Sequence, residues 1–170
     1  MKMELVKWSP AMKQELIDVC NAVDRTFLSN RMPDPYTEEA ADWWLGMVSE
    51  HDGKDGLFRA IVIDGRLAGS ISVEQKEDVY SRDAEIGYML LTEYWSKGIM
   101  TEAVRRICGQ AFSDLDIIRI TGLVYARNTA SLRVLEKNGF VKEGVKRNAV
   151  YKDGKVYDLC LYGKLKERLL

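Results

Sequence analysis

The sequence contains few of the residues that build histidine or cysteine chemistry. Among its 170 residues there are one histidine, His51, and three cysteines scattered along the chain. A zinc site with several histidine ligands is therefore excluded, and a histidine-based triad is disfavoured because His51 lies in a polar stretch at residues 49–53. The cysteines form neither a Cys-x-x-Cys pair nor an even disulfide set, which favours a reducing compartment.

Strong net charge and long apolar runs are also absent. The 25 Lys and Arg residues against 26 Asp and Glu residues give a formal net charge of −1, so overall charge does not predict nucleic-acid binding. No apolar run is long enough to span a bilayer, and residues 1–4 show no apolar signal region, so we expect a cytoplasmic protein that does not bind membranes. Hydrophobic residues make up 46% of the chain, which predicts one domain over residues 1–170 with a sizeable core.

The stretch at residues 83–115 has the clearest pattern. Its first part alternates, with one apolar face formed by Ala84, Ile86, Tyr88 and Leu90, and this period of two predicts a strand. From residue 100 onwards apolar residues recur at three- and four-residue steps, which predicts an amphipathic helix. The turn between them carries Gly98 at the helix entrance. Because a helix start offers unpaired N–H groups and a partial positive charge, this turn predicts a phosphate site, to which Lys97 adds a full charge.

The remaining elements complete an alternating order. Strands are predicted near residues 4–8, 57–62, 67–73, 84–91, 117–124, 140–150 and 156–165. Helices are predicted from residue 10 to about residue 29, and near residues 37–48, 100–115 and 128–138. The order β-α-α-β-β-β-α-β-α-β-β predicts an α/β protein whose mixed sheet is covered by helices on both faces.

Two motifs carry a resemblance to a known family. The turn reads Trp95-Ser96-Lys97-Gly98-Ile99-Met100, and neither common nucleotide-binding glycine motif occurs in the chain. The turn resembles the acyl-CoA pyrophosphate loop of the GNAT acetyltransferase superfamily, Q/R-x-x-G-x-G/A, with Gly98 at the central glycine. Met100 departs from that pattern, and Trp95 at the first position is similar to the branch that acetylates ribosomal-protein N-termini. Residues 128–140, followed by Glu143-Gly144, are similar to the most recognisable motif of that branch, and the element order resembles the GNAT fold over nearly the full chain.

The resemblance implies direct transfer of acetyl from acetyl-CoA to an amine, without an acylated enzyme and without a metal. It implies that backbone amides in the turn bind the pyrophosphate, and that a splayed strand end binds the pantetheine amides and offers an N–H to the oxyanion. It also implies that Asn128 hydrogen-bonds the pantetheine arm, beside its role as a helix cap. The residues assigned to acetyl-CoA in this way are Met89, Leu90, Leu91, Trp95, Ser96, Lys97, Gly98, Ile99, Met100, Thr101, Asn128 and Ser131.

Two catalytic candidates follow from the same resemblance. Ser131 matches a serine proposed to lie near the sulfur in this branch, whereas Leu135 stands where many other members have a tyrosine and cannot donate a proton. Glu85, on the less apolar face of the central strand, is a candidate general base; a strand residue held in a salt bridge is the alternative. Some members of the branch carry an acid at the position of Val150, so this chain departs there.

The acceptor is left open by the sequence. A protein N-terminus is favoured, and a lysine, a polyamine or a small-molecule amine are alternatives, as is a non-catalytic sensor of acyl-CoA. We expect loops at residues 29–37 and 75–82 to set acceptor specificity. The expected partners are acetyl-CoA and the amine acceptor, in a monomer or homodimer. Weaker candidates for lining the acceptor groove are Tyr36, Tyr151 and Tyr162.

Overall fold

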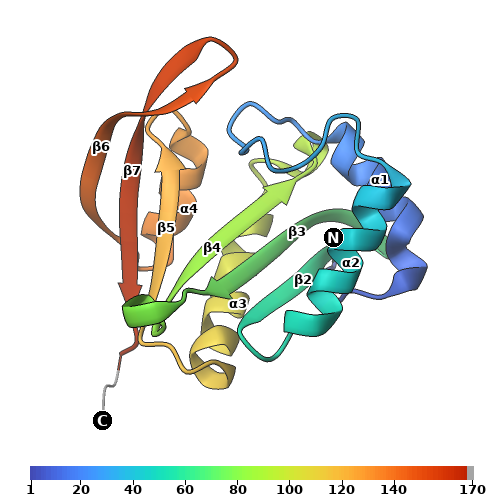
Figure 1. The fold of residues 1–170 in the computed structure, drawn as a ribbon, viewed down its shortest axis with the longest axis horizontal. Helices are drawn as coiled ribbons and strands as arrows, with labels where there is room; N and C mark the ends of the chain where they lie inside the picture. The colour runs from blue at the N-terminus through green and yellow to red at the C-terminus, as the bar shows by residue number, and fades with distance from the viewer. Residues whose placement is uncertain (168–170) are drawn as a thin grey trace.

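One mixed seven-stranded sheet organises the molecule, in a computed structural model that describes residues 1–167. The strand order across the sheet is β1-β2-β3-β4-β5-β7-β6. The strands are β1 (Met3–Lys7), β2 (Gly56–Ile63), β3 (Arg66–Gln75), β4 (Asp83–Leu90), β5 (Arg119–Tyr125), β6 (Val141–Lys152) and β7 (Lys155–Leu165). The helices are α1 (Lys13–Ala22), α2 (Glu38–His51), α3 (Ile99–Asp114) and α4 (Thr129–Lys137). The predicted element order and the mixed sheet are confirmed (Figure 1).

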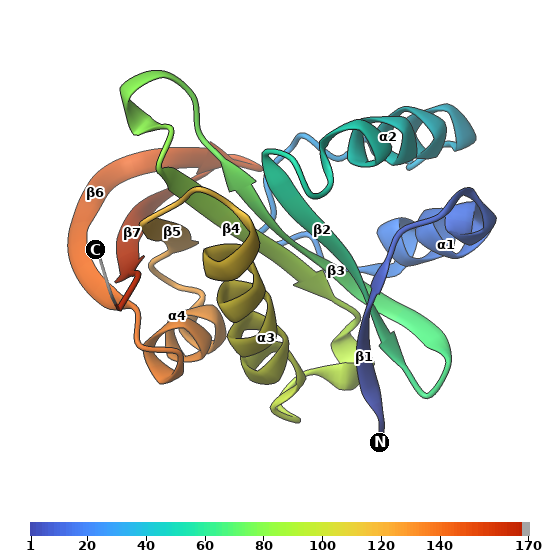
Figure 2. The same cartoon turned by 90° about the horizontal axis from the view of Figure 1, so that it is seen from below.

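The helices cover both faces of the sheet, as predicted. Figure 2 shows α1 and α2 on one side and α3 and α4 on the other. The main hydrophobic core lies between the sheet and the pair α3 and α4, and two smaller apolar clusters lie under α1 and α2. None of the helices described in residues 1–167 is long and apolar enough to cross a membrane.

The first helix is shorter than the sequence pattern predicted. Its predicted end near residue 29 is wrong, because Val23 has an extended backbone and the helix stops before it. The Arg25 guanidinium donates hydrogen bonds at 2.8–3.0 Å to three main-chain carbonyls, which belong to Cys20, Met32 and Pro33. These bonds compete with the backbone hydrogen bonds of a longer helix. They hold residues 24–36 as an ordered connection.

The sheet opens between its two central strands. β4 and β5 are parallel, and their ladder joins only residues 83–85 to residues 119–121. Beyond Glu85 and Thr121 both strands continue without pairing to each other, and Figure 1 shows them diverging toward one edge of the molecule. The outer neighbours persist, since β3 pairs with β4 as far as Leu90 and β7 pairs with β5 as far as Tyr125. The sheet therefore has a V-shaped gap at its centre.

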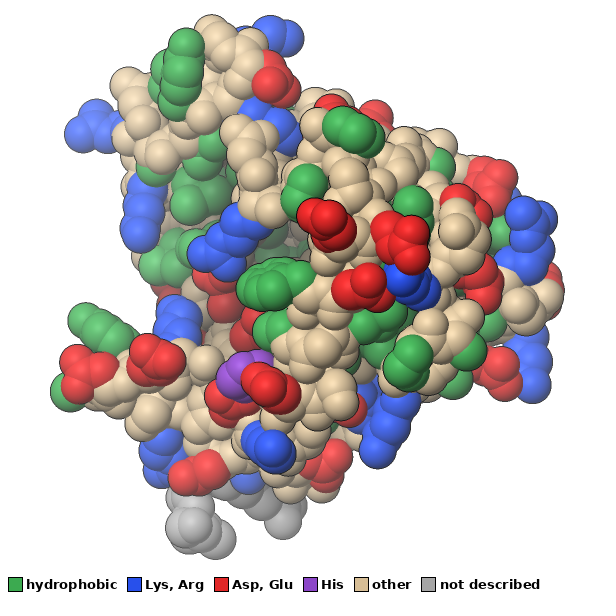
Figure 3. All heavy atoms as spheres, turned by 45° about the vertical axis from the view of Figure 1, so that its right-hand side comes forward, with side chains coloured by type: hydrophobic (Ala, Val, Ile, Leu, Met, Phe, Trp, Pro, Cys, Tyr) green, Lys and Arg blue, Asp and Glu red, His purple; other side chains and the backbone are tan. Residues whose placement is uncertain are grey.

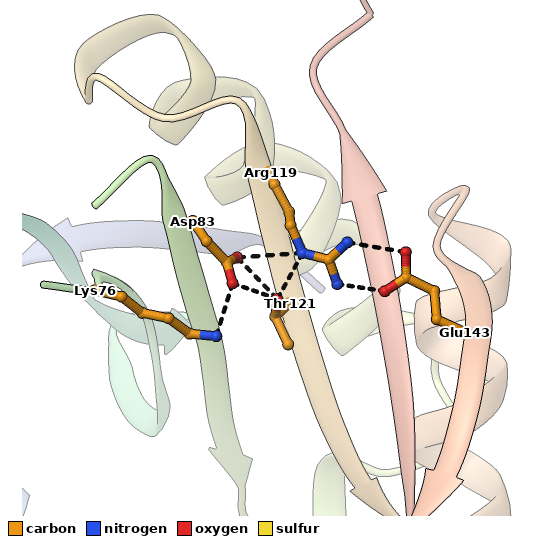
Figure 4. Close-up of polar contacts among 5 residues, drawn as sticks. All are labelled: Lys76, Asp83, Arg119, Thr121 and Glu143. Atoms are coloured by element: carbon orange, nitrogen blue, oxygen red, sulfur yellow. Dashed lines mark hydrogen bonds and ion pairs between the residues drawn. The ribbon is translucent and has the colours of Figure 1, made fainter. Parts of the chain in front are cut away.

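Polar side chains fasten the closed end of this gap (Figure 4). The Asp83 carboxylate on β4 accepts hydrogen bonds from Lys76 Nζ at 2.7 Å and from Thr121 Oγ1 at 2.8 Å. Arg119 Nε on β5 lies 3.5 Å from the same carboxylate and donates to Thr121 Oγ1 at 3.0 Å. Charged and hydroxyl groups thus tie the strands together at the last point where their backbones still pair.

The same network extends across β7 to β6. The Arg119 guanidinium forms a bidentate ion pair with Glu143, with Nη1 2.9 Å from Oε2. This pair crosses Gly163 of β7, where a Cβ atom would lie 2.7 Å from both partners. The arginine holds the pKa of Glu143 below its usual range. The absence of a side chain at Gly163 therefore allows one ion pair to link three strands.

We expect Gly69→Ala to destabilise the protein, because a Cβ at Gly69 of β3 would collide with the backbone of β4. A Cβ at this position would lie 3.0 Å from Leu90 Cα and still closer to the Met89 carbonyl oxygen. Overpacking of this kind costs about 1–3 kcal/mol in free energy of unfolding, measurable by chemical denaturation. The control is Gly109→Ala inside α3, where a Cβ meets nothing within 4 Å and the change should stabilise the helix by up to about 1 kcal/mol. Equal stability of the two variants would contradict this expectation.

Candidate active site

The turn before α3 is held in a conformation that exposes backbone amides. Ser96 and Gly98 both have left-handed backbone, with φ of 58° and 75°. Gly98 is the N-cap of α3 and has no side chain to cap the helix. The Trp95 amide is already used, since it donates to the Thr92 carbonyl at 3.1 Å, and the Gly98 carbonyl accepts from Glu102 N at 3.2 Å. The amides of residues 96–101, between these two bonds, can therefore serve an anion.

The side chains of the turn leave this amide surface open. The Trp95 indole folds back and donates from Nε1 to the Leu90 carbonyl at 2.8 Å, which fastens the turn to the end of β4. Met100, which departs from the family pattern, packs against the main core. Lys97 is exposed, with its ammonium 5.9 Å from the centre of the Tyr94 ring. The Met100 side chain thus lies in the core, and only its backbone amide belongs to the anion site.

The end of β4 directs some backbone groups into the gap and others away from it. The Leu91 amide donates to the Ala68 carbonyl of β3 at 2.9 Å, and the Met89 carbonyl also faces β3. In an antiparallel pair, alternate residues direct both N–H and C=O to the same neighbour. The backbone groups of Tyr88 and Leu90 therefore face β5, where the ladder has ended. Of the three residues assigned to the cofactor at this strand end, only Leu90 directs its backbone into the gap.

The start of α4 lies on the opposite wall of the gap. Asn128 is the N-cap, and its Oδ1 accepts the Ser131 amide at 3.2 Å, so its predicted capping role is confirmed. This bond uses the oxygen and leaves the Asn128 amide nitrogen for a further acceptor. Leu135, one turn later, is fully buried and lies against Gly122 of β5. The position therefore contributes packing to the core rather than a polar group to the gap.

Ser131 meets a residue that the sequence did not single out. The Ser131 Oγ lies 2.6 Å from the hydroxyl oxygen of Tyr88, which projects from β4 on the α3 and α4 side. Burial raises the pKa of Tyr88 to about 12, against the opposing effect of the Ser131 hydrogen bond. The alternating pattern of β4 predicts the face on which Tyr88 lies. The contact itself spans 43 positions in the chain and has no local signal.

Glu85 lies on the other face of β4. It is exposed, and it occupies the last residue of the ladder with β5. Its cross-strand neighbour on β3 is Glu74, whose pKa is raised by burial and also by the charge of Glu85. Within residues 1–167 no ion pair involves Glu85, which disfavours the reading of Glu85 as a salt-bridged strand residue. Met89, two strand periods further, packs against the clusters under α1 and α2, so Glu85 faces that side of the sheet.

Two segments border the open end of the gap on the α1 and α2 side. The first is the connection after α1, and the second is the β6–β7 hairpin. Lys152 of the hairpin is buried and donates to the carbonyls of Arg25 and Leu28, the latter at 2.6 Å. Tyr125, at the end of β5, donates to the same Leu28 carbonyl at 3.1 Å. Figure 3 shows the surface hollowed between this hairpin and the rest of the molecule, with hydrophobic side chains in the hollow.

Other residues considered from the sequence have simpler positions. Tyr162 is 2% exposed in the main core, where it donates to Glu136 of α4 at 2.8 Å, so it does not line an acceptor groove on the α1 and α2 side. Tyr36 is 6% exposed, and Tyr151 is 76% exposed on β6. His51 ends α2 and lies 2.8 Å from Asp55, and it is visible as the purple side chain in Figure 3. Within the described part of the chain, no group of three or more metal-ligating side chains is placed to hold a metal ion.

Comparisons with known proteins identify relatives of this chain. The family model described as an acetyltransferase (GNAT) domain matches residues 3–141. YdaF, a putative ribosomal N-acetyltransferase of Bacillus subtilis, is 34% identical over 133 residues, covering 78% of this chain and 70% of YdaF. YjcK, a probable N-acetyltransferase of the same organism, is 40% identical over 136 residues, covering 74% of each chain.

Solved structures share the fold. The ribosomal-protein-S5-alanine acetyltransferase from Vibrio fischeri superposes with a TM-score of 0.79 at 25% identity, covering 97% of this chain and 92% of that one. RimL, a ribosomal L7/L12 alpha-N-protein acetyltransferase solved with coenzyme A, superposes with a TM-score of 0.85 at 24% identity, covering 97% and 94%. The likeness extends over almost the whole of the chain.

We expect Gly98→Asp to weaken coenzyme A binding far more than Gly98→Asn. Asp and Asn are nearly isosteric and both tolerate the left-handed backbone that Gly98 adopts, so the two variants carry similar strain. Only Asp places a negative charge beside the amides that face the phosphates. Calorimetry should give an affinity at least about 10-fold lower for Asp than for Asn, a difference of about 1.4 kcal/mol. Equal coenzyme A affinities in two folded variants would contradict the assignment of the phosphates to this turn.

Proposed function

Since the chain belongs to the GNAT acetyltransferase family and is an acetyl-CoA-dependent N-acetyltransferase, we propose that it acetylates the N-terminal amine of a protein. The observation that carries the proposal is the gap between β4 and β5, with Ser131 on one face of the sheet and Glu85 on the other. The relatives support the acceptor class, because YdaF is described as a putative ribosomal N-acetyltransferase and the Vibrio fischeri protein as a ribosomal-protein-S5-alanine acetyltransferase.

Acetyl-CoA would enter the gap from the α3 and α4 side. The amides of residues 96–101 would bind the pyrophosphate, with Lys97 adding charge. The pantetheine arm would lie along the end of β4, where the backbone of Tyr88 and Leu90 is directed to the gap. The Asn128 amide nitrogen would donate to the same arm, since its oxygen is used by the helix cap. The Leu90 carbonyl is already bonded to Trp95, which leaves the Leu90 N–H as the donor there.

The reaction would then be a direct displacement. The amine nitrogen attacks the thioester carbon, and the developing oxyanion accepts a hydrogen bond from a backbone N–H of β4 in the gap. The C–S bond breaks and its electron pair leaves on sulfur, where the Ser131 hydroxyl donates a hydrogen bond. Glu85, on the acceptor face, takes the proton from the amine directly or through one water. Positioning both reactants in one gap supplies much of the barrier reduction.

The protonation of the acceptor favours an N-terminus over a lysine. A peptide N-terminal amine has a reference pKa of about 8, whereas that of lysine is about 10.4, so a larger neutral fraction of the former is present near neutral pH. One observation favours a polyamine as a second candidate. The neighbouring carboxylates Glu74 and Glu85 lie on the acceptor face and would attract a substrate with more than one positive charge.

We expect thiol release from acetyl-CoA to be fastest with peptides that have a free N-terminus. The comparison set is a peptide with a free N-terminus and acetylated lysines, the same peptide with a blocked N-terminus and free lysines, and spermidine. With the first peptide the rate should rise with pH up to about 8, as the amine becomes neutral. Turnover with spermidine but with neither peptide would contradict the protein N-terminus as acceptor and indicate a polyamine instead. Tight binding of acetyl-CoA without thiol release for any amine would instead indicate a sensor.

We expect Glu85→Gln to lower kcat by about 10²-fold with little change in acetyl-CoA affinity, because the amide cannot accept the amine proton. Glu74→Gln is the matched control, since it removes the neighbouring carboxylate of the same face and leaves Glu85 in place. Its kcat should stay within a few-fold of wild type. An equal rise of the acceptor KM in the two variants, with kcat unchanged, would assign the carboxylates to attraction of a cationic acceptor. Wild-type kcat and an unaltered pH profile in Glu85→Gln would show that Glu85 is not the general base.

A further inference from the structure

Tyr88 and Ser131 form a polar pair inside an otherwise apolar wall. Tyr88 packs against the main core from β4, and Ser131 is 9% exposed in the first turn of α4. Their hydroxyl oxygens are 2.6 Å apart, which is a short O–H···O distance. The contact bridges the gap beyond the last paired residues of β4 and β5, so it joins the two walls between which acetyl-CoA is proposed to lie.

The direction of this hydrogen bond decides which proton is left for a ligand. Each hydroxyl has one proton to donate, and the distance alone allows either to be the donor. Within residues 1–167 Ser131 is the hydrogen-bond partner of the Tyr88 hydroxyl, and the Ser131 amide is satisfied separately by Asn128. If Tyr88 donates, its proton is satisfied inside the wall and the Ser131 proton is free. If Ser131 donates, no proton of Ser131 remains for the gap.

The greater acidity of a phenol favours the first arrangement, because it makes Tyr88 the better donor of the pair and Ser131 Oγ the better acceptor. The pKa of Tyr88 is raised to about 12, so the phenol keeps its proton at neutral pH and can donate throughout the reaction. The nearby Cys108 thiol is also buried, and its pKa is likewise raised to about 12, so it adds no charge beside the pair. Leu135 fills the core beside Gly122 and offers no competing donor or acceptor.

We propose that Tyr88 is a positioning residue which donates its hydroxyl proton to Ser131 Oγ and thereby points the Ser131 proton at the thioester sulfur. The inference rests on the proposed function, and it adds a residue that acts through Ser131 rather than on the substrate. As the C–S bond breaks, the electron pair goes to sulfur and the oriented Ser131 O–H donates to it. No proton leaves Tyr88, and the proton that finally neutralises the thiolate is supplied by solvent or by the acid form of the base.

The test is a double-mutant cycle measured with the best acceptor of the wild-type protein. Ser131→Ala should lower kcat by about 10²-fold, as expected for a lost donor at a leaving group. Tyr88→Phe should lower kcat by about 5- to 10-fold, the effect of one lost hydrogen bond, with coenzyme A affinity and acceptor KM unchanged. In the Ser131→Ala background, Tyr88→Phe should have no further effect, because Tyr88 acts only through Ser131.

Two controls separate a positioning role from loss of structure. Tyr162→Phe removes another buried phenol hydroxyl, bonded to Glu136 in the same core, and should leave kcat unchanged. Thermal unfolding of both Phe variants reports any loss of stability. Wild-type kcat in Tyr88→Phe overturns the inference. The inference is also overturned if the fold losses of kcat in the two single variants multiply in the double mutant. A wild-type protein that releases no thiol with any amine overturns the proposed function instead.

Discussion

The site depends on where the backbone pairing of β4 and β5 stops. Two parallel strands normally satisfy one another along their length, yet here the ladder ends at Glu85 and Thr121 while both strands continue. Unpaired N–H and C=O groups at the centre of a sheet are costly unless another partner satisfies them. A chain of amides such as the pantetheine arm can satisfy them by extending the ladder. The interruption of one ladder thus accounts for the gap and leaves backbone groups in it that an amide-bearing ligand can pair with.

The gap is held open because β4 and β5 are tied together at one end only, while each is paired along its length with a different outer strand. At the closed end, Asp83, Thr121 and Arg119 fasten the strands, and the ion pair with Glu143 extends the restraint across Gly163. Along the sides, β3 keeps β4 in place and β7 keeps β5 in place. At the open end, Trp95 ties the turn before α3 to the Leu90 carbonyl. The pairing along the sides and the Trp95 bond each act on one wall, whereas the polar ties at the closed end join both walls where their backbones still pair.

Local sequence patterns predicted the helices and strands. The features that were mispredicted or missed depend on contacts between residues far apart in the chain. The alternation of apolar residues predicted β4, and their three- and four-residue spacing predicted α3. Gly98 predicted the turn between them. The end of α1 was mispredicted because Arg25 bonds to carbonyls as far as residue 33. The sequence placed Tyr88 on the correct face of its strand, but its partner lies 43 residues away on α4. Likewise, the alternation of backbone direction, which separates Leu90 from its neighbours, depends on the pairing of β4 with β3.

The period of a strand also explains how one short segment can serve both ends of the reaction. Tyr88 and Glu85 are three residues apart, an odd number, so their side chains project to opposite faces of the sheet. Ser131 therefore meets the gap from the α4 side and Glu85 faces the α1 and α2 side. On that side, the connection after α1 and the β6–β7 hairpin border the open end of the gap, and Lys152 joins them at the Arg25 and Leu28 carbonyls. The rim on this side of the gap is therefore ordered, since the buried lysine and Arg25 fix these two segments to each other and to the body of the protein.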